Sequence, residues 1–340
     1  MDKKLKIGIV GTGRIGKVHT MSIMNHLPQA ELKGVTDIDL EQAREWAAQA
    51  GIGTVYGDYK AMLADPEIDA VLVCSSTDTH ADIAIAAANA GKHVFCEKPV
   101  DLSIEKVEAV ITAAEKAGVK LQIGFNRRFD HNFRKVKELV DNGTIGDLQI
   151  LKITSRDPSP PPMEYVKVSG GIFMDMTIHD FDMARFLTGS EADEIYVAAA
   201  CMVDPAIGEA GDADTALITI RFENGAICVI DNSRKSAYGY DQRVEAFGSK
   251  GKVEITNDHP STAVWSTEAG VCSEKPMYFF LERYMDSFAE EMRQFVNALI
   301  NGTDTPVTGF DGLQPIKLGL AAKKSMAEGR PVKLREIEPQ

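Results

Sequence analysis

The sequence predicts a two-domain α/β protein, in which a parallel sheet covered by helices precedes an α+β domain with a large, open and mostly antiparallel sheet. Over residues 1–123, nearly continuous apolar runs alternate with helix-like stretches and short turns, a pattern typical of repeated βα units. Beyond residue 125, strand-like runs follow one another without intervening helices, which favours antiparallel pairing. The length of 340 residues also suggests two domains, and we place them at 1–123 and 124–340.

The first domain begins with an apolar, β-branched run at 5–10, followed by a glycine turn and a helix that ends near His26. Strands of this kind are typical of a sheet that is buried on both faces. Further strands are expected at 31–37, 69–74, 92–99 and 119–125, and further helices at 40–51, 79–91 and 103–118. The helix at 40–51 ends on a glycine, which is a common stop signal.

The second domain starts with a helix at about 132–141, a strand at 148–157 and a proline-rich loop. The stretch 169–187 carries apolar residues at helical spacing and is expected to form a helix. The remaining elements are strands at 194–203, 214–222, 225–235, 241–249 and 251–257, with a hairpin turn at Glu223, Asn224 and Gly225, and helices at about 280–300 and 312–326.

Composition and charge argue against several classes of partner. The net charge of −13 disfavours nucleic acid, because phosphate binding needs clustered Lys and Arg. No run approaches the roughly 18 uncharged apolar residues of a membrane span, and the first residues lack a cleavable signal pattern, so we expect a cytoplasmic protein. The five cysteines are scattered and odd in number. They fit neither a disulfide framework nor a zinc site and are expected to be reduced.

Residues 11–16 carry the spacing G-x-G-x-x-G between an apolar strand and a helix, which is the context that dinucleotide binding requires. In such a loop Gly11 permits the tight turn, Gly13 lets the backbone approach a pyrophosphate, and Gly16 lets the helix pack on the strand. The N-terminus of the helix adds free N–H groups that favour phosphate. Asp37 ends the second strand, where a carboxylate binds the ribose hydroxyls and repels the extra phosphate of NADP. We therefore predict a Rossmann domain that binds NAD.

Lys98 lies between Glu97 and Pro99 at the end of a strand of the predicted parallel sheet. Ligands of such sheets bind at the carboxyl ends of the strands, so this lysine is placed to approach a nicotinamide and a substrate hydroxyl. Considered alone, a lysine at a strand end is more often a solvated surface side chain. Its functional interpretation therefore depends on the rest of the site.

Four ionisable side chains interrupt the apolar pattern of 169–187. Asp175 and His179 are four residues apart and share a helix face, which Asp182 continues one turn later. Asp180 falls in register with the apolar residues, so it is expected to point into packed structure and to need a partner there. Oxidising a secondary alcohol requires a base, and histidine titrates in the right range. An acid at the start of a helix beside a satisfied core histidine is the alternative interpretation.

An aspartate and a histidine four residues apart also have the spacing of zinc ligands. The rest of the chain offers no obvious third and fourth ligand for them. We therefore expect no metal at this site.

Five segments together resemble the Gfo/Idh/MocA oxidoreductases, namely GIVGTGRIG, DAVLVCSSTDTHADIA, HVFCEKPV, QIGFNRRFD and GGIFMDMTIHDFDMARFL. The resemblance extends from about Lys6 to Lys333. It implies a Rossmann domain followed by an α/β domain whose open sheet is often buried in a homotetramer. Within the family, the segments GFNRRFD, SRDPSPPPMEY and KSAYGYD are similar to the branch that oxidises inositols. This similarity implies NAD-dependent oxidation of the axial hydroxyl of myo-inositol to scyllo-inosose.

The resemblance also implies roles for individual residues. Lys98 would hold the reacting hydroxyl beside the nicotinamide, and His179, aided by Asp175, would accept its proton. The implied polyol contacts are Lys98, Arg127, Asp157, Asp175, His179, Tyr238 and Tyr240. The implied cofactor contacts are Gly11, Gly13, Arg14, Ile15, Gly16, Asp37, Ser75, Thr77, His80, Glu97 and Lys98.

Other activities stay open at this point. The loop Pro158–Pro162 departs from some relatives and is expected to border the substrate, so a dehydrogenase of scyllo-inositol, another cyclitol or a pyranose is the nearest alternative. The absence of a dense basic cluster in the sequence favours an uncharged polyol, although Arg127 and Arg128 keep a sugar acid open. A non-catalytic NAD-binding regulator would be expected to lack the lysine, aspartate or histidine, and all three are present.

Overall fold

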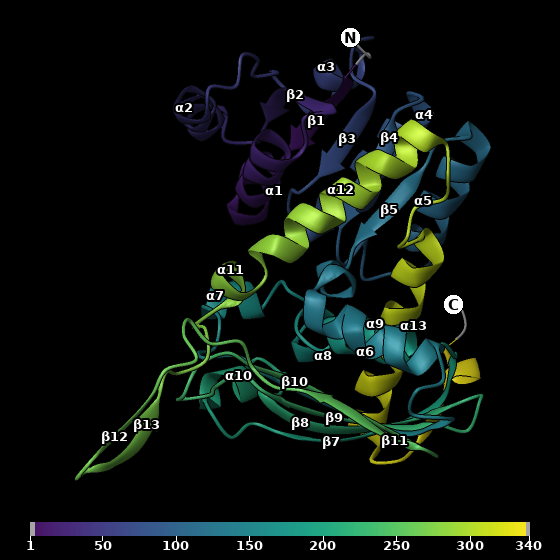
Figure 1. Ribbon diagram of the computed structural model, residues 1–340. Helices are drawn as coiled ribbons and strands as arrows, with labels where there is room; N and C mark the ends of the chain where they lie inside the picture. The colour runs from purple at the N-terminus through teal and green to yellow at the C-terminus, as the bar shows by residue number, and fades with distance from the viewer. Residues whose placement is uncertain (1–3, 338–340) are drawn as a thin grey trace. The chain divides into compact units, whose positions relative to one another are not determined.

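The computed structural model describes residues 4–337 and divides the chain into two compact units (Figure 1). The units comprise residues up to 129 together with 286–316, and residues 130–285 together with the segment from 317 onward. The sequence suggested one boundary, after residue 123, and no return of the chain to the first domain. The structure differs in both respects, because a late helix completes the core of the first unit.

The first unit is built on a parallel sheet with the strand order β2-β1-β3-β4-β5. Its strands are β1 (Leu5–Val10), β2 (Ala30–Thr36), β3 (Ala70–Val73), β4 (His93–Glu97) and β5 (Leu121–Gly124). Every residue of β3 and β5 is buried. The predicted parallel sheet is confirmed, and its strands read as continuous apolar runs because both faces are covered.

Local sequence explains where the helices of this unit begin and end. The helices between the strands are α1 (Arg14–His26), α2 (Leu40–Ala50), α3 (Tyr59–Leu63), α4 (Thr77–Asn89) and α5 (Ile104–Ala117). Asp39 and Ser103 cap α2 and α5 by accepting backbone N–H groups of the first turn. Both helices end at a glycine in the left-handed conformation, Gly51 and Gly118.

Helix α12 (Met285–Asn301) is the late element that returns to the first unit. Its Met292, Phe295 and Val296 join a buried cluster with residues of β1, β3 and β4. The rings of Phe295 and Phe95 meet edge-on with their centroids 5.7 Å apart. Phe95 and Phe295 are 200 residues apart in the sequence, and β1 and β3 are farther still from α12, so no local pattern in the sequence indicates these contacts.

The second unit is built on a seven-stranded sheet with the order β11-β10-β6-β9-β8-β7-β14. Its strands are β6 (Leu148–Arg156), β7 (Ala192–Ala200), β8 (Thr215–Phe222), β9 (Ile227–Ser233), β10 (Asp241–Gly248), β11 (Gly251–Ile255) and β14 (Val332–Lys333). Strands β6 and β9 are parallel neighbours, and the other neighbouring pairs are antiparallel. The predicted mostly antiparallel sheet is confirmed, as is the hairpin turn at Gly225, whose φ is +89°.

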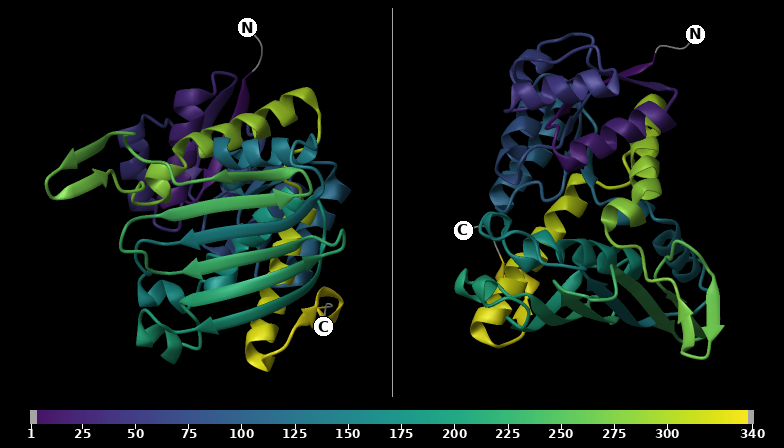
Figure 2. Two further views of the ribbon diagram at one scale, coloured as in Figure 1. Left: turned by 60° about the horizontal axis from the view of Figure 1, so that its bottom comes forward. Right: turned by 90° about the vertical axis from the view of Figure 1, so that its left-hand side faces the viewer.

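One face of this sheet is covered and the other is open. Helices α6 (His131–Asp141) and α9 (Ile178–Thr188) pack on the covered face, α9 against β6 and α6 against β10 and β11. Along β8, buried and exposed residues alternate, because successive side chains of a strand point to opposite faces. Figure 2 shows the open face of the sheet toward the viewer in its left-hand view.

Several short elements were not expected from the sequence. Strands β12 (Val264–Thr267) and β13 (Gly270–Ser273) pair in a hairpin that projects from the second unit (Figure 1). Both strands are exposed along their whole length, so they lack the alternation by which a half-buried strand is found. Other unexpected elements are α7 (Met163–Val166), α10 (Pro205–Glu209), η1 (Asn126–Phe129) and η2 (Leu334–Glu336). Three further helices lie where the sequence predicted helix, namely α8 (Ile172–Asp175), α11 (Phe280–Arg283) and α13 (Gly309–Glu328).

Two sequence expectations concern membranes and cysteines. Within residues 4–337, no helix is long and apolar enough to cross a bilayer. All five cysteines are free, as expected, and Cys74, Cys96 and Cys228 are buried. Burial raises the pKa of these three thiols, so they are poor nucleophiles and are packing residues.

Candidate active site

The glycine loop after β1 has the geometry of a dinucleotide cradle. Gly11 has a φ of +100°, and a Cβ there would lie 2.5 Å from the carbonyl carbon of Cys74. A Cβ on Gly16 would lie 2.0 Å from the carbonyl oxygen of Gly11, whereas one on Gly13 would meet no atom within 4 Å. Two of the glycines therefore permit close packing, and the third borders open space. This space lies at the N-terminus of α1, where a pyrophosphate would accept backbone N–H groups.

The start of α1 suits an anion. Gly13 is the N-cap, and the first turn of the helix contains no acidic residue that would repel a phosphate. Arg14 is exposed beside the loop, and Ile15 packs against the buried cluster of the unit. Arg14 is thus placed beside the proposed phosphate position, whereas Ile15 supports the loop from beneath.

Asp37 lies directly after β2 and is tied to the glycine loop. Its Oδ2 accepts hydrogen bonds from the backbone N–H of Thr12 at 2.6 Å and from the Thr12 hydroxyl at 3.0 Å. Its Oδ1 accepts the backbone N–H of Asp39 at 3.1 Å. These bonds fix the carboxylate beside the cradle, which is the position expected for a ribose contact. The contact itself stays a prediction.

Ser75, Thr77 and His80 lie between β3 and the first turns of α4. The Ser75 and Thr79 hydroxyls are 2.7 Å apart. The ring of His80 is buried, with Nδ1 2.8 Å from the carbonyl oxygen of Pro99 and Nε2 3.0 Å from that of Ser75. His80 thus ties the segment after β3 to the segment after β4. It supports the edge of the site from within, and a direct cofactor contact for it stays a prediction.

Glu97 and Lys98 differ in where they lie. The Glu97 carboxylate is buried, with Oε1 2.6 Å from Nε2 of His19, and its Oε2 accepts the backbone N–H of Lys98 at 3.2 Å. Lys98 is half-buried and follows β4 directly. The side chain of Glu97 therefore points into the unit, and only Lys98 lies at the edge as the sequence suggested.

These residues gather at one edge of the first sheet. Gly11 follows β1, Asp37 follows β2, Ser75 comes two residues after β3, and Lys98 follows β4. Because all the strands are parallel, their carboxyl ends share that edge, where ligands of such sheets bind. The sequence-predicted cofactor residues of this unit are thus brought together by the topology.

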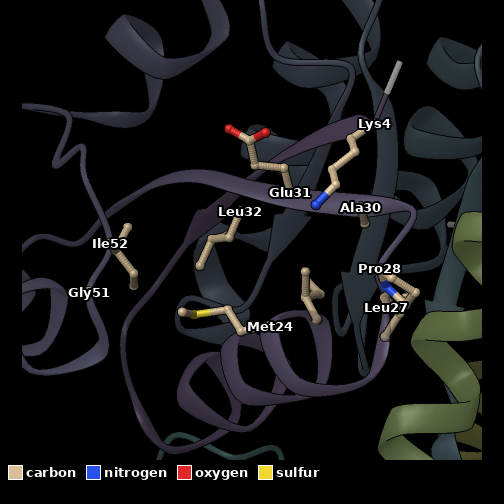
Figure 3. A pocket seen from close by; sticks show the side chains of 10 residues that line it. Lys4, Met24, Leu27, Pro28, Ala30, Glu31, Leu32, Gly51 and Ile52 are labelled. Atoms are coloured by element: carbon tan, nitrogen blue, oxygen red, sulfur yellow. The ribbon is translucent and has the colours of Figure 1, made fainter. Parts of the chain in front are cut away.

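A hollow of about 240 Å³ lies elsewhere in the first unit, between α1 and β2 (Figure 3). It is lined by Lys4, Ile23, Met24, Leu27, Pro28, Ala30, Glu31, Leu32, Gly51 and Ile52. Lys4 precedes β1, and Ala30 begins β2, so the hollow lies at the amino ends of the strands. We assign no part of the reaction to it.

Arg127 and Arg128 lie in η1, which follows β5. Arg127 is buried, although a polyol contact would require an accessible guanidinium. Arg128 donates to Asp311 at 3.0 Å. That ion pair removes one of the two cations on which the sugar-acid alternative rested. A polyol contact for Arg127 stays a prediction.

In the second unit, the predicted helix at 169–187 is divided into α8 and α9. The backbone between them keeps helical dihedral angles at Met176 and Thr177 but changes its hydrogen bonding. The Thr177 N–H donates to the carbonyl of Ile172, five residues back, and that of His179 donates to Met176, three residues back. The chain is therefore tightened locally between Asp175 and His179.

Asp175 and His179 are the two accessible residues between positions 171 and 185. All the remaining residues of that range are buried. Asp180 is fully buried and accepts a hydrogen bond from Asn232 Nδ2 at 2.9 Å, which confirms that it points into packed structure and has a partner there. Asp182 is also buried, so it does not continue the exposed face of Asp175 and His179 as the spacing suggested.

Asp175 is held by two residues that sequence reasoning missed. The Tyr165 hydroxyl donates to Oδ1 at 2.9 Å, and Nη1 of Arg234 donates to Oδ2 at 3.2 Å. Arg234 is buried, and its Nη2 lies 3.9 Å from Oδ2 of Asp212. Arg234 comes one residue after β9, where no local pattern distinguishes it from an ordinary surface arginine. Its importance follows from the carboxylates that the fold places beside it.

Asp214 fixes the backbone beside Arg234. Its carboxylate accepts the consecutive backbone N–H groups of Met202, Val203 and Asp204, and its carbonyl accepts the N–H of Arg234 at 2.8 Å. Burial by itself raises the pKa of Asp214, but the three N–H groups outweigh this effect and lower the pKa to about 2. The side chain is therefore an ionised anchor at neutral pH.

The remaining predicted polyol contacts lie at the same end of the second sheet. Asp157 follows β6, and its backbone bonds with Ser233 and Ser236 extend the strand pairing. Tyr238 is 43 % exposed, and its hydroxyl donates to Asp241 at 2.6 Å.

Tyr240 is only 7 % exposed. Its ring meets those of Phe279 and Tyr284 edge-on. This placement makes Tyr240 a packing residue, and Tyr238 the more accessible of the two tyrosines in the YGYD segment. Contacts of either tyrosine with a polyol stay predictions.

Comparison with known proteins identifies the family. A model described as "Oxidoreductase family, NAD-binding Rossmann fold" matches residues 5–125, and the GFO/IDH/MocA C-terminal domain matches residues 133–254. The chain belongs to the Gfo/Idh/MocA family of oxidoreductases. The predicted family, the α/β fold class and NAD as cofactor are thereby confirmed.

Full-length relatives of this Gfo/Idh/MocA protein include named inositol dehydrogenases. It is 49 % identical to a myo-inositol 2-dehydrogenase of Thermotoga maritima, over 98 % of this chain and 99 % of the relative. A solved myo-inositol dehydrogenase of Corynebacterium glutamicum matches with a TM-score of 0.93 and 38 % identity, over 97 % of this chain and 99 % of that one. A scyllo-inositol dehydrogenase of Lactobacillus casei, solved with NAD(H) and scyllo-inositol, matches with a TM-score of 0.92 and 33 % identity, over 98 % and 100 %. The protein is an NAD-dependent oxidoreductase.

Proposed function

We propose that the protein oxidises myo-inositol with NAD, converting the axial hydroxyl to a ketone and releasing scyllo-inosose. The observation that carries the proposal is the accessibility of Asp175 and His179 in a segment that is otherwise buried from residue 171 to residue 185. An acid and a base that stay accessible in an otherwise buried segment are better suited to a role in proton transfer than to a packing role. The 49 % identity to a myo-inositol 2-dehydrogenase over nearly the whole chain supports the choice of substrate.

Three residues carry the proposed chemistry. The alcohol O–H bond breaks and its proton passes to a ring nitrogen of His179, while the electron pair of the adjacent C–H bond leaves as hydride and the C=O bond forms. Lys98 donates a hydrogen bond to the reacting oxygen, which stabilises the negative charge that develops as the proton leaves. Asp175, held by Tyr165 and Arg234, orients a substrate hydroxyl or the imidazole.

When bound, NAD⁺ supplies the hydride acceptor. The loop from Gly11 to Gly16 would hold its pyrophosphate, and Asp37 would accept hydrogen bonds from its adenosine ribose. Ser75 and Thr77 offer further hydroxyls at the same sheet edge. The hydride and the proton together account for both hydrogens that the alcohol loses, so the products are the ketone, NADH and a protonated base.

Scyllo-inositol is the second candidate substrate. The 33 % identity to an enzyme solved with scyllo-inositol favours it over a pyranose. The two inositols differ in the orientation of one hydroxyl, so the same acid and base would serve both. A discriminating contact would have to come from the side chains around the ring, such as Tyr238 or Asp157.

We also propose a homotetramer that buries the open face of the second sheet. Phe247, Ile150 and Ile227 are direct cross-strand neighbours on β10, β6 and β9. Each is about 40 % exposed, and together they form an apolar row on this face, where Val229 of β9, Leu217 of β8 and Tyr196 of β7 are exposed as well. Such a row is typical of a protein–protein interface.

The five free cysteines support the expected cytoplasmic location, because that compartment keeps thiols reduced.

The decisive experiment measures NADH formation by the purified protein with myo-inositol, scyllo-inositol, chiro-inositol, glucose and glucose 6-phosphate. The proposal expects the highest kcat/KM for myo-inositol. A preference for scyllo-inositol would move the assignment to the second candidate, and turnover of glucose without any inositol would overturn both. No turnover of any polyol would contradict the proposed activity.

A further inference from the structure

A buried hydrogen bond connects the helix of the glycine loop to the strand that ends at Lys98. His19 lies in the second turn of α1, and Glu97 is the last residue of β4. Nε2 of His19 and Oε1 of Glu97 are 2.6 Å apart, and neither residue has appreciable solvent exposure. Since a carboxylate is an acceptor, the geometry assigns the proton of this bond to Nε2 of His19.

The surroundings of His19 hold its ring in one orientation. The ring meets the edges of Phe95 and Phe288, with centroids 5.0 Å and 5.7 Å away. Phe95 belongs to β4 and Phe288 to α12, which lies beside α1 in Figure 1. Nδ1 of His19 is buried and has no hydrogen-bond partner among the described residues. The bond to Glu97 is therefore the polar contact that orients this imidazole.

The other oxygen of Glu97 acts on Lys98. Oε2 accepts the backbone N–H of Lys98 at 3.2 Å, so the carboxylate folds back over the next peptide and restrains it. Gly124, at the end of the neighbouring strand β5, leaves room for this arrangement. A Cβ on Gly124 would lie 2.9 Å from Oε2 of Glu97.

A metal site is the alternative for this cluster. His19, Glu97 and Glu291 each offer a ligand atom, and the three atoms lie within 4.8 Å of one another. However, the 2.6 Å between Nε2 and Oε1 is shorter than the separation of about 3.3 Å between two ligands that bind one zinc ion tetrahedrally at about 2.0 Å. The contact is therefore a hydrogen bond, and the two atoms are too close together to be ligands of one zinc ion.

We infer that His19 and Glu97 are positioning residues that set Lys98 relative to the glycine loop. The inference rests on the proposed function, in which Lys98 holds the reacting hydroxyl. The glycine loop begins α1, so the position of α1 determines where a bound pyrophosphate lies. The His19–Glu97 bond connects that helix to the residue before Lys98. It therefore fixes the distance between Lys98 and the position of a cofactor bound at the glycine loop. Small errors in such a distance lower the reaction rate strongly.

A purely structural role would be served better by two apolar side chains. Burying a histidine and a carboxylate costs desolvation that a well-packed hydrophobic pair of similar volume avoids. Each of the two hydrogen bonds of Glu97 has a required donor, acceptor and angle. Unlike apolar packing, such bonds can hold Lys98 at a defined position relative to α1.

The experiment compares Glu97→Ala and His19→Leu with the conservative variants Glu97→Gln and His19→Gln. Glutamine at 97 keeps an oxygen for the Lys98 N–H, and its amide N–H2 can donate to Nε2 of His19 once the imidazole proton moves to Nδ1. Glutamine at 19 keeps an N–H donor near the position of Nε2. We expect Glu97→Ala and His19→Leu to lower kcat about tenfold to a hundredfold, with the Kd for NADH within about twofold of wild type. The conservative variants should recover most of kcat.

Two further variants separate positioning from stability. Ile23→Ala removes a core side chain from the same helix, one turn beyond His19. It should lower Tm as much as His19→Leu and leave kcat unchanged. Gly124→Ala leaves the residue types at 19 and 97 unchanged, but its added Cβ would displace the Glu97 carboxylate. It should therefore lower kcat as well. The double variant His19→Leu/Glu97→Ala should lose no more activity than Glu97→Ala alone, since Glu97→Ala already removes the bond that His19→Leu breaks.

The outcomes separate this inference from the proposed function. Wild-type protein that oxidises no polyol would contradict the proposed function, and the inference would then be decided by amide hydrogen exchange at Lys98. That exchange should be at least about tenfold faster in Glu97→Ala and near wild type in Glu97→Gln. If wild type is active but both disruptive variants keep kcat within twofold, the positioning role is wrong. Equal losses of kcat and NADH affinity, or no rescue by glutamine, would overturn it as well.

Discussion

Replacing Arg234 by methionine tests whether the buried cation beneath Asp175 organises the site. The Arg234 side chain is 1 % exposed and the Asp175 side chain is 16 % exposed, so solvent screens the ion pair only weakly. At 3.2 Å and an effective dielectric constant of about 20, two unit charges attract by about 5 kcal/mol. Desolvation offsets part of this attraction. Removing one partner of such a pair typically costs about 3 kcal/mol, because the other charge is left uncompensated.

That cost has two measurable consequences. For a unit of about 180 residues, about 3 kcal/mol corresponds to a fall in Tm of about 6–12 °C, which differential scanning fluorimetry detects. We also expect kcat/KM for the polyol to fall about tenfold to a hundredfold, because Asp175 loses the bond that fixes its Oδ2. NADH affinity should stay within about twofold of wild type, since the glycine loop belongs to the other unit.

The matched control is Arg335→Met, which removes an exposed arginine from η2 of the same unit. Surface substitutions of this kind change stability by no more than about 0.5 kcal/mol. Arg234→Lys keeps the charge but loses the planar fork, so it should fall between wild type and Arg234→Met. A methionine variant with a Tm within 2 °C of wild type and unchanged kcat/KM would refute the role assigned to Arg234.

Four other predictions follow from the site and the sheet. Lys98→Ala and His179→Ala should each lower kcat by about a hundredfold or more, while NADH fluorescence titrations still show binding. Asp37→Ser should raise the ratio of NADP to NAD kcat/KM, because the carboxylate that repels the 2′-phosphate is gone. Asp214→Asn should be less stable by about 2 kcal/mol at pH 6 in urea unfolding, a difference that shrinks between about pH 4 and pH 2. Phe247→Glu should shift the protein to a smaller assembly in light scattering coupled to size-exclusion chromatography.

The pH window for Asp214 follows from the sign of its shift. The pKa is about 2 in the folded chain, against an ordinary value of 3.8 for an aspartate. A depressed pKa contributes stability that is fully present above about pH 4 and is lost as the pH falls toward 2. An asparagine cannot titrate, so the difference between the two proteins isolates this residue from the other acids. A difference that stays constant down to pH 2 would contradict the assignment.

The other three predictions are equally open to contradiction. Wild-type rates in either Lys98→Ala or His179→Ala would remove that residue from the mechanism, and loss of NADH binding would point to misfolding. An unchanged cofactor ratio in Asp37→Ser would mean that the ribose contact lies elsewhere. If Phe247→Glu keeps the size of the wild-type assembly, the open sheet face is not the interface, and Val264→Glu in the projecting hairpin provides a comparison on a different surface.

The sequence by itself determined the features that depend on short spacing. The glycine loop is readable because its three glycines lie within six residues, between a strand and a helix. Asp175 and His179 were found because residues four apart share a helix face. The tightening between α8 and α9 did not alter their common accessibility. The parallel and antiparallel sheets were likewise predicted from local alternation and the order of elements.

Only the tertiary structure decided the partners of these residues. His19 and Glu97 are 78 residues apart and Asp175 and Arg234 are 59 apart, and no periodicity relates such distant positions. The same holds for α12. Its apolar side chains are those of any amphipathic helix, and only the folded chain shows that they pack against the first sheet. Composition fixes which residues must be buried, but the identity of their neighbours depends on how separate elements pack. The polar pairs that orient Asp175 and restrain Lys98 therefore emerge only when the chain is folded.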